Sequence, residues 1–119
     1  MSMNTETRDI IMTRGDTERI RVTLRMDGDV YEMQTGDEIH FGVKRNFNDA
    51  DCLIRKTYTQ NPFILDIEPD DTEGLDFGTY RYDMEFVAAN GYTVTFAKKK
   101  RLKLTEEVCT PVEEVTNDG

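Results

Sequence analysis

Apolar and basic residues alternate over the segment that follows Asp16, and this alternation limits the fold of the chain more than any other feature. Every second residue is apolar, and most of the residues between are arginines. The apolar positions are Ile20, Val22, Leu24 and Met26. A period of two places the two kinds of side chain on opposite faces of an extended chain, so the segment predicts a half-buried β-strand.

The same period recurs in short runs along the sequence, and no run has the period of a helix. Turn residues, chiefly Gly, Asp and Asn, separate the runs at roughly ten-residue spacing. The expected strands cover residues 9–13, 20–26, 39–43, 52–59, 63–67, 78–87, 92–96 and 102–104. About seven or eight short strands of this kind predict an all-β fold, an antiparallel β-sandwich with Greek-key connections.

Length and composition fit one soluble domain. The 119 residues are 33% charged and 37% hydrophobic, and a chain of this size buries roughly two-thirds of its unfolded surface. No stretch approaches the ~20 apolar residues of a membrane span, and the first residues lack the features of a secretory signal. We expect a flexible N-terminus over 1–8, one domain over 9–109 and a polar tail over 110–119, in a protein that stays in the cytosol or leaves it by lysis.

The tripeptide Arg14-Gly15-Asp16 is one that integrins bind on secreted proteins. A cytosolic protein meets no integrin, and a three-residue motif needs a supporting context. The tripeptide falls between the first two expected strands, where Gly15 permits a bend and Asp16 can bond to local backbone. We therefore interpret Gly15 and Asp16 as a structural corner.

Few residues suit catalysis. Cys52 and Cys109 are far apart in the sequence, so neither belongs to a Cys-x-x-Cys metal or redox pair. His40 is the only histidine, and the alternation around it places it on the solvent face of its strand. The sequence has no phosphate-binding glycine loop and no Ser-His-Asp order. We expect free thiols, no cofactor and no enzymatic activity.

An acidic stretch that starts in the strand expected over 63–67 contains the candidate ligands for Ca²⁺. They are Asp66, Glu68, Asp70 and Asp71. Their spacing differs from that of a calcium-binding loop, and a strand face or a helix cap uses the same residue types. Asp70 and Glu73 are spaced as a capping pair for one helical turn. We expect no bound metal.

Basic residues cluster near the end of the chain, at Lys98, Lys99, Lys100, Arg101 and Lys103. A cationic hairpin can contact phosphates, but a net charge of −9 repels a polyanion at long range. We therefore expect no nucleic-acid partner, and we expect Tyr92, Val94 and Phe96 in the core. The cluster is interpreted as a cationic loop or strand edge that faces an acidic partner. Together with Arg19, Arg21 and Arg25, the cluster makes some strands basic, whereas the side over 66–76 is acidic. This segregation of charge suggests a salt-sensitive head-to-tail association of the chain with itself.

The segment Asp76-x-Gly78-x-Tyr80 precedes the longest alternating strand. An aspartate, a small residue and a tyrosine at this spacing are typical of the tyrosine corner of Ig-like sandwiches. We expect the Tyr80 hydroxyl to bond back to the upstream backbone. The chain has Tyr82 where antibody domains carry a cysteine, and it has no Trp. We therefore expect an antiparallel Ig-like β-sandwich without the disulfide-and-tryptophan core of antibody domains.

Several stretches occur in a fixed order: R-G-D-T, an Asp-Gly turn followed by Tyr31, G-D-E-I-H-F-G-V-K, D-T-E-G-L-D-F-G-T-Y-R-Y-D-M-E, and L-K-L-T-E-E-V. Together, over about residues 10–109, they resemble the N-terminal Ig-like domain of siphophage baseplate upper proteins and related short prophage proteins of Gram-positive bacteria. The resemblance implies a structural domain that docks onto neighbouring tail or baseplate subunits and carries no chemistry. Baseplate upper proteins continue into a long helical region, so the resemblance implies a tail-associated module rather than one place on the particle.

Two functions follow. The first is a phage or prophage structural protein of the virion, present in the host cytoplasm before assembly, whose partners are other tail or baseplate proteins and itself. The alternative is a carbohydrate- or ligand-binding β-sandwich whose site is formed by the loops around 46–51 and Gly91. The first function predicts a protein partner, and the second predicts a small ligand that raises the melting temperature.

Overall fold

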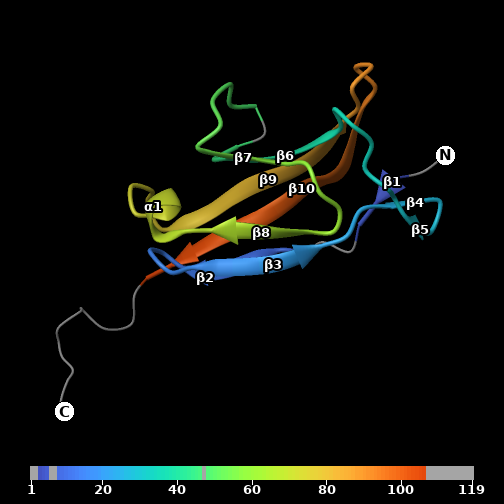
Figure 1. Ribbon diagram of the computed structural model, residues 1–119. Coiled ribbons are helices and arrows are strands. Elements are labelled where there is room, and N and C mark those ends of the chain that lie inside the picture. Colours follow the sequence, from blue (N-terminus) through green and yellow to red (C-terminus); the bar gives the residue numbers. More distant parts are fainter. Residues whose placement is uncertain (1–2, 6–7, 47, 107–119) are drawn as a thin grey trace, which may run out of the picture.

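Strands make up most of the structure. The computed structural model describes residues 3–5, 8–46 and 48–106 (Figure 1). The strands are β1 (Met3–Asn4), β2 (Ile10–Thr13), β3 (Glu18–Val22), β4 (Arg25–Met26), β5 (Asp29–Val30), β6 (Glu38–Lys44), β7 (Ile54–Tyr58), β8 (Phe63–Ile67), β9 (Gly78–Val87) and β10 (Thr93–Thr105), and one helical turn, α1 (Pro69–Thr72), follows β8. The prediction of an all-β fold is confirmed. Cys109 and the tail over 110–119 lie outside the described residues.

The strands form a five-stranded sheet, β2-β10-β9-β6-β7, a two-stranded sheet, β3-β8, and a three-stranded sheet, β1-β4-β5. All neighbouring strands are antiparallel except β2 and β10, which are parallel. In Figure 1, β3 and β8 lie across one face of the five-stranded sheet. Strand β1 lies inside the segment that was expected to be flexible, and it pairs with β4.

The core fills the space between β3-β8 and the five-stranded sheet. Inward-facing residues of β9 alternate with outward-facing ones, as the period of two predicts. One buried cluster joins both sheets and includes Ile39, Phe41, Val43, Phe63, Leu65, Ile67, Tyr80, Tyr82, Met84 and Phe86. The two-layer core is therefore built from the apolar rows that the alternation identified.

Side-chain contacts close the long side of the molecule where β7 meets β8. The Tyr58 ring stacks on Phe63 with ring centroids 4.4 Å apart, and its hydroxyl donates to Asp66 Oδ1 at 2.8 Å. Lys56 Nζ pairs with Asp71 Oδ2 at 2.7 Å. Burial, together with the hydrogen bond to Asp66, raises the pKa of Tyr58. These contacts hold β7 against β8 and α1.

Residues 20–26 form two strands rather than the single strand that was predicted. β3 ends at Val22 and β4 begins at Arg25, although Leu24 between them is fully buried. The Leu24 N–H donates to Asn61 Oδ1 at 2.8 Å, and its carbonyl accepts from Asn61 Nδ2 at 2.9 Å. A side chain from a distant loop thus makes the backbone bonds that a neighbouring strand would otherwise make.

Residues 93–105 form one long strand, β10, where two were predicted. Its pairing with β9 shifts between Thr95 and Ala97 and again before Lys100. Ala97 is buried, Val94 and Phe96 are partly buried against the core, and Tyr92, which precedes β10, is half exposed. The expectation that Tyr92 belongs to the core is therefore wrong.

The Arg14-Gly15-Asp16 tripeptide is a corner between β2 and β3, as predicted. The Asp16 N–H donates to the Thr13 carbonyl at 3.1 Å, and Gly15 has a φ of 86°, which favours glycine. The Arg14 guanidinium donates to the Leu75 carbonyl at 3.2 Å and lies 4.3 Å from the centroid of the Phe77 ring. The corner is thereby attached to the loop that follows α1.

The segment around α1 has the predicted helical turn, with a different capping contact. The Glu68 N–H donates to Asp71 Oδ2 at 2.8 Å, so the capping pair of α1 is Glu68 and Asp71. The sequence had predicted Asp70 and Glu73 as this pair. Downstream, the Tyr80 hydroxyl donates to the Asp76 carbonyl at 2.7 Å, and Gly78 has a φ of 138°. The predicted bond from Tyr80 to the upstream backbone is confirmed.

Candidate interaction surface

Three basic residues stand side by side on the outer face of the five-stranded sheet. Lys44 of β6 is opposite Arg81 of β9, and Arg81 is opposite Arg101 of β10. Neighbouring strands are about 4.8 Å apart, and like charges directly opposite one another destabilise a sheet. We call Lys44, Arg81 and Arg101 the cationic row.

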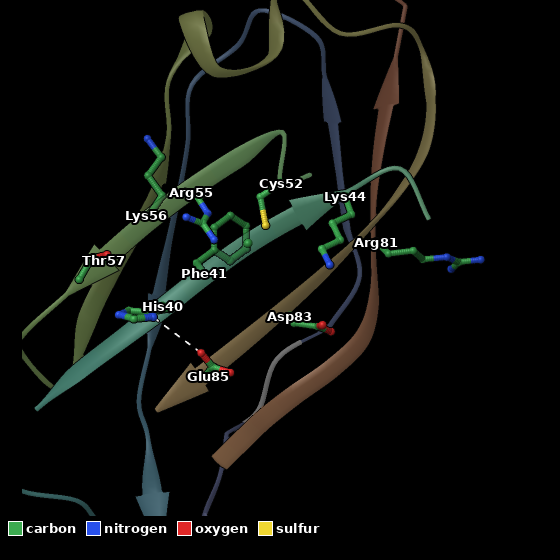
Figure 2. Close-up of a pocket in the computed structure, with 11 residues that line it drawn as sticks. His40, Phe41, Lys44, Cys52, Arg55, Lys56, Thr57, Arg81, Asp83 and Glu85 are labelled. Carbon is green, nitrogen blue, oxygen red and sulfur yellow. Dashed lines mark ion pairs between the residues drawn. The ribbon is translucent and has the colours of Figure 1, made fainter. Parts of the chain in front are cut away.

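A hollow of about 290 Å³ lies beside this row (Figure 2). Its floor is Gly42, which is opposite Arg55 of β7 and Asp83 of β9. A Cβ atom at position 42 would lie 3.3 Å from Cys52 Sγ, so glycine leaves the space into which this half-buried thiol projects. Arg55 adds a further cation at the rim.

The same face of the sheet carries acidic side chains toward the Glu38 end of β6. His40 Nδ1 lies 3.7 Å from Glu85 Oε1 (Figure 2). His40 Nε2 lies 2.8 Å from Glu38 Oε1. Asp83 Oδ1 accepts a hydrogen bond from the Lys99 N–H at 3.0 Å. The face therefore changes from cationic at the Lys44 end of β6 to acidic at its Glu38 end, and His40 is partly exposed as predicted.

The basic cluster of Lys98, Lys99, Lys100, Arg101 and Lys103 lies within β10, not in a loop. All but the half-buried Lys100 are exposed, and Lys99 has a φ of 61° where the pairing shifts. Residues 102–104 lie between β2 and β9, so Lys103 is not at a sheet edge. Residues 98–101 have no partner strand among the described residues on the side away from β9, so this part of the cluster is at an edge of the sheet. The cluster contributes Arg101 to the cationic row and Lys103 next to it on the same face.

Three of the four candidate calcium ligands bond to different partners. Asp66 accepts from the Tyr58 hydroxyl, Glu68 Oε2 pairs with Arg19 at 3.2 Å, and Asp71 pairs with Lys56. Asp70 is exposed. Among the residues that the structure describes, no three His, Cys, Asp or Glu side chains are grouped to hold a metal ion. The acidic stretch serves to cap α1 and to hold neighbouring strands.

The two loops proposed as a shared ligand site are at opposite ends of β6. The loop over 46–51 follows Lys44, whereas the turn at Gly91 follows Val87, which is opposite Glu38. A seven-residue strand spans roughly 20 Å, so one small ligand cannot contact both loops. In Figure 1 the two loops are well separated, and the sequence-based site at these loops is not assembled.

Sequence reasoning missed Lys44, Arg55 and Arg81 as members of this surface. The alternation in β6 and β9 shows that these side chains face outward, but the register between the strands decides that they are neighbours. The register of β6 with its two neighbours also places His40 opposite Thr57 of β7 and Glu85 of β9.

Comparison with the models of known protein families gives no match, and no curated protein has a significantly similar sequence. Within the described part of the chain, no helix is both long and apolar enough to cross a membrane.

Proposed function

We propose that this protein is a non-enzymatic assembly module of a phage or prophage tail or baseplate, an Ig-like domain that acts through protein–protein contacts. Its partners would be other tail or baseplate proteins and further copies of itself, in the virion or in the host cytoplasm before assembly. The resemblance of its motifs to the N-terminal domain of baseplate upper proteins motivates the proposal.

The strand pairing supports the Ig-like part of the proposal. In Ig-like sandwiches the second and fifth strands pair in one sheet, and the third, sixth and seventh pair in the other. β3-β8 and β6-β9-β10 have these relationships, with β7 added beside β6 as in the variable type. The Tyr80–Asp76 bond occupies the place of a tyrosine corner at the start of β9.

The observation that carries the function is the cationic row in a chain whose net charge is −9. Three cations side by side form a positively charged strip, and an acidic protein surface would be electrostatically complementary to it. The chain has such a surface at its α1 end, where Asp70, Glu73 and Asp76 are exposed. Head-to-tail contact between copies is therefore the self-association that we favour.

A second candidate function, binding of a small polar ligand such as a sugar, rests on the hollow at Gly42. Its volume of about 290 Å³ is at the lower end of ligand pockets, and His40, Asp83 and Arg55 offer donors and acceptors around it. A ligand in this hollow would raise the melting temperature.

The decisive experiment quantifies the protein in gradient-purified particles from an induced host culture. The wild-type chain is compared with Arg101→Glu in the row and with Arg25→Glu, a matched charge reversal on exposed β4. We expect the wild-type and Arg25→Glu chains at a fixed ratio to the tail subunits, and Arg101→Glu depleted. Absence of the wild-type protein from particles, while it is abundant in the lysate, would contradict the proposal.

A further inference from the structure

The two long sides of the molecule differ in how they are closed. Where β7 meets β8, the Tyr58–Phe63, Tyr58–Asp66 and Lys56–Asp71 contacts bridge the sheets. Where β2 meets β3, no side-chain hydrogen bond or ion pair joins these two strands within the described residues. A hollow of about 600 Å³ lies on this second side instead.

The hollow has an apolar wall and a charged rim. Its apolar lining includes Ile10, Ile11, Ile20 and Val22. Ile20 is half-buried, and Ile11 is 67% exposed, so the wall is accessible. The charged lining residues are Arg8, Asp9, Glu18 and Arg21. Asp9 already accepts from the Arg101 N–H at 3.0 Å, and half-buried Glu18 lies on the face of β3 that carries Ile20 and Val22. Arg8 and Arg21 are the two cations of the lining, and Arg21 is on the outer face of β3.

β3 presents a free backbone edge beside the hollow. Its five residues pair with β8 on one side, and no other strand of the described ranges 3–5, 8–46 and 48–106 pairs with it. Alternate N–H and C=O groups of such an edge point outward and can form a ladder with an added strand. The edge is about 14 Å long from Glu18 to Val22, enough for five residues of an extended chain.

The charges of Arg19 and Arg21 indicate which kind of strand can pair with the free edge of β3. A second copy paired symmetrically through β3, centred on Ile20, would place Arg19 opposite Arg21, and like charges directly opposite are unfavourable. Arg19 is already held by Glu68 at 3.2 Å, whereas exposed Arg21 has no ion pair among the described contacts. An added strand with acidic residues on its outer face would therefore suit this edge better than β3 of another copy.

We infer that the free edge of β3 binds an extended segment of a partner protein in which apolar and acidic residues alternate. Main-chain hydrogen bonds extend the two-stranded sheet, apolar side chains enter the hollow beside Ile10 and Ile20, and carboxylates meet Arg21 and Arg8. The inference rests on the proposed function only in that the domain acts through protein–protein contacts. It adds a second contact surface, on a different face from the cationic row.

The test uses the full chain and a capped peptide of about nine residues in which Val and Glu alternate. Binding is followed by the amide resonances and by amide hydrogen exchange. We expect a dissociation constant below about 1 mM and slowed exchange at residues 18–22. Arg21→Glu, an exposed change, should weaken binding about fivefold, whereas Arg55→Glu, an exposed change on β7 at the other edge of the five-stranded sheet, should leave it unchanged.

Three results would overturn the inference. They are no binding at millimolar peptide, equal binding of a peptide with the same residues in scrambled order, and slow exchange along the outward amides of β3 before any peptide is added. The last would mean that the edge is already occupied. None of these results bears on Arg101→Glu in the particles, so the strand site and assembly through the cationic row can fail independently.

Discussion

The backbone N–H of Gly15 donates a hydrogen bond of 2.8 Å to the hydroxyl of Thr72, whose side chain is completely buried. The two residues are 57 positions apart. The bond ties the corner between β2 and β3 to α1, a helical turn too short to be stable alone. A tripeptide that resembles an adhesion motif is thus part of the internal framework of the domain.

Replacing Thr72 with valine should destabilise the domain. Valine keeps the shape of the side chain but leaves the Gly15 N–H without its acceptor, at a cost of about 1–2 kcal/mol. Urea unfolding of Thr72→Val and Thr72→Ser provides the measurement, since serine retains the hydroxyl. A valine variant more stable than the serine variant would show that the methyl group matters more than the bond.

Asp37 should make stability depend on acidic pH. Its carboxylate is 4% exposed and accepts from the Tyr31 hydroxyl at 2.7 Å and from the Gln34 N–H at 2.9 Å. Burial raises the pKa of Asp37, but hydrogen bonds from Gln34, Tyr31 and the Ala89 backbone outweigh it, so the net shift is downward. A pKa lower in the folded state gives stability that is present above about pH 4 and is lost as the pH falls further.

The matching variant is Asp37→Asn. It should lower the free energy of unfolding by about 1–3 kcal/mol at pH 7, because the amide cannot accept all three bonds from donors in place. The difference from wild type should shrink as the pH falls below about 4. Urea unfolding at neutral and acidic pH measures both, and a difference that is constant with pH would refute this role of Asp37.

Tyr31 should make the stability of the domain depend on pH in the alkaline range. Burial, then the hydrogen bond and charge of Asp37, raise its pKa to about 12. A pKa raised in the folded state gives stability that is present below about pH 10, the ordinary value, and is lost as the pH rises through about 12. The Tyr31→Phe variant should be less stable than the wild-type chain at pH 7. It should also lose less stability than wild type between about pH 10 and pH 12, as unfolding followed by circular dichroism would show.

Removing the Tyr80 hydroxyl should cost about 1 kcal/mol. The bond to the Asp76 carbonyl holds the chain at the entry to β9, and Tyr80→Phe leaves that carbonyl without this donor. Tyr92→Phe, at a ring that is 50% exposed, provides the control and should leave the urea midpoint unchanged. Equal midpoints for the two variants would mean that the corner contributes nothing to stability.

Relieving the cationic row should stabilise the free domain. Arg101→Gln removes one opposed pair of like charges and should raise the free energy of unfolding by about 0.3 kcal/mol at low salt. The gain should vanish at 1 M salt, where screening acts within about 3 Å. Arg25→Gln, outside the row, should show no such gain, and a salt-independent effect at Arg101 would argue against repulsion as the cause.

The strands were predictable because a period of two survives in sequence wherever one face is buried. Ile39, Phe41 and Val43 are inward-facing in β6 as expected, and the Asp-Gly turn at 27–28 joins β4 to β5. The interruption of the strand at Leu24 was not predictable, because it depends on the side chain of Asn61, 37 residues away. The residues near Leu24 in the sequence do not indicate its hydrogen bonds to Asn61.

The interaction surface was predictable only in part, for a related reason. Arg101 stands out in a basic run, whereas Lys44 and Arg81 are single basic residues in ordinary alternating strands. Their proximity depends on strand order and register, and a shift by one residue would place them on the opposite face. Where the pairing of β10 shifts, the Lys99 N–H bonds to the Asp83 side chain of β9, a contact between strands that the local pattern does not indicate.

The parallel pairing of β2 with β10 has a mechanical consequence. The four paired positions run from Ile10 with Leu102 to Thr13 with Thr105, so a pull on the N-terminal side of β2 and the C-terminal side of β10 draws the two strands past each other lengthwise. After the two pairs of β1 and β4 separate, the ladder between β2 and β10 bears the load as a unit and does not open one bond at a time. A module stretched along its chain would therefore resist tension at this strand pair.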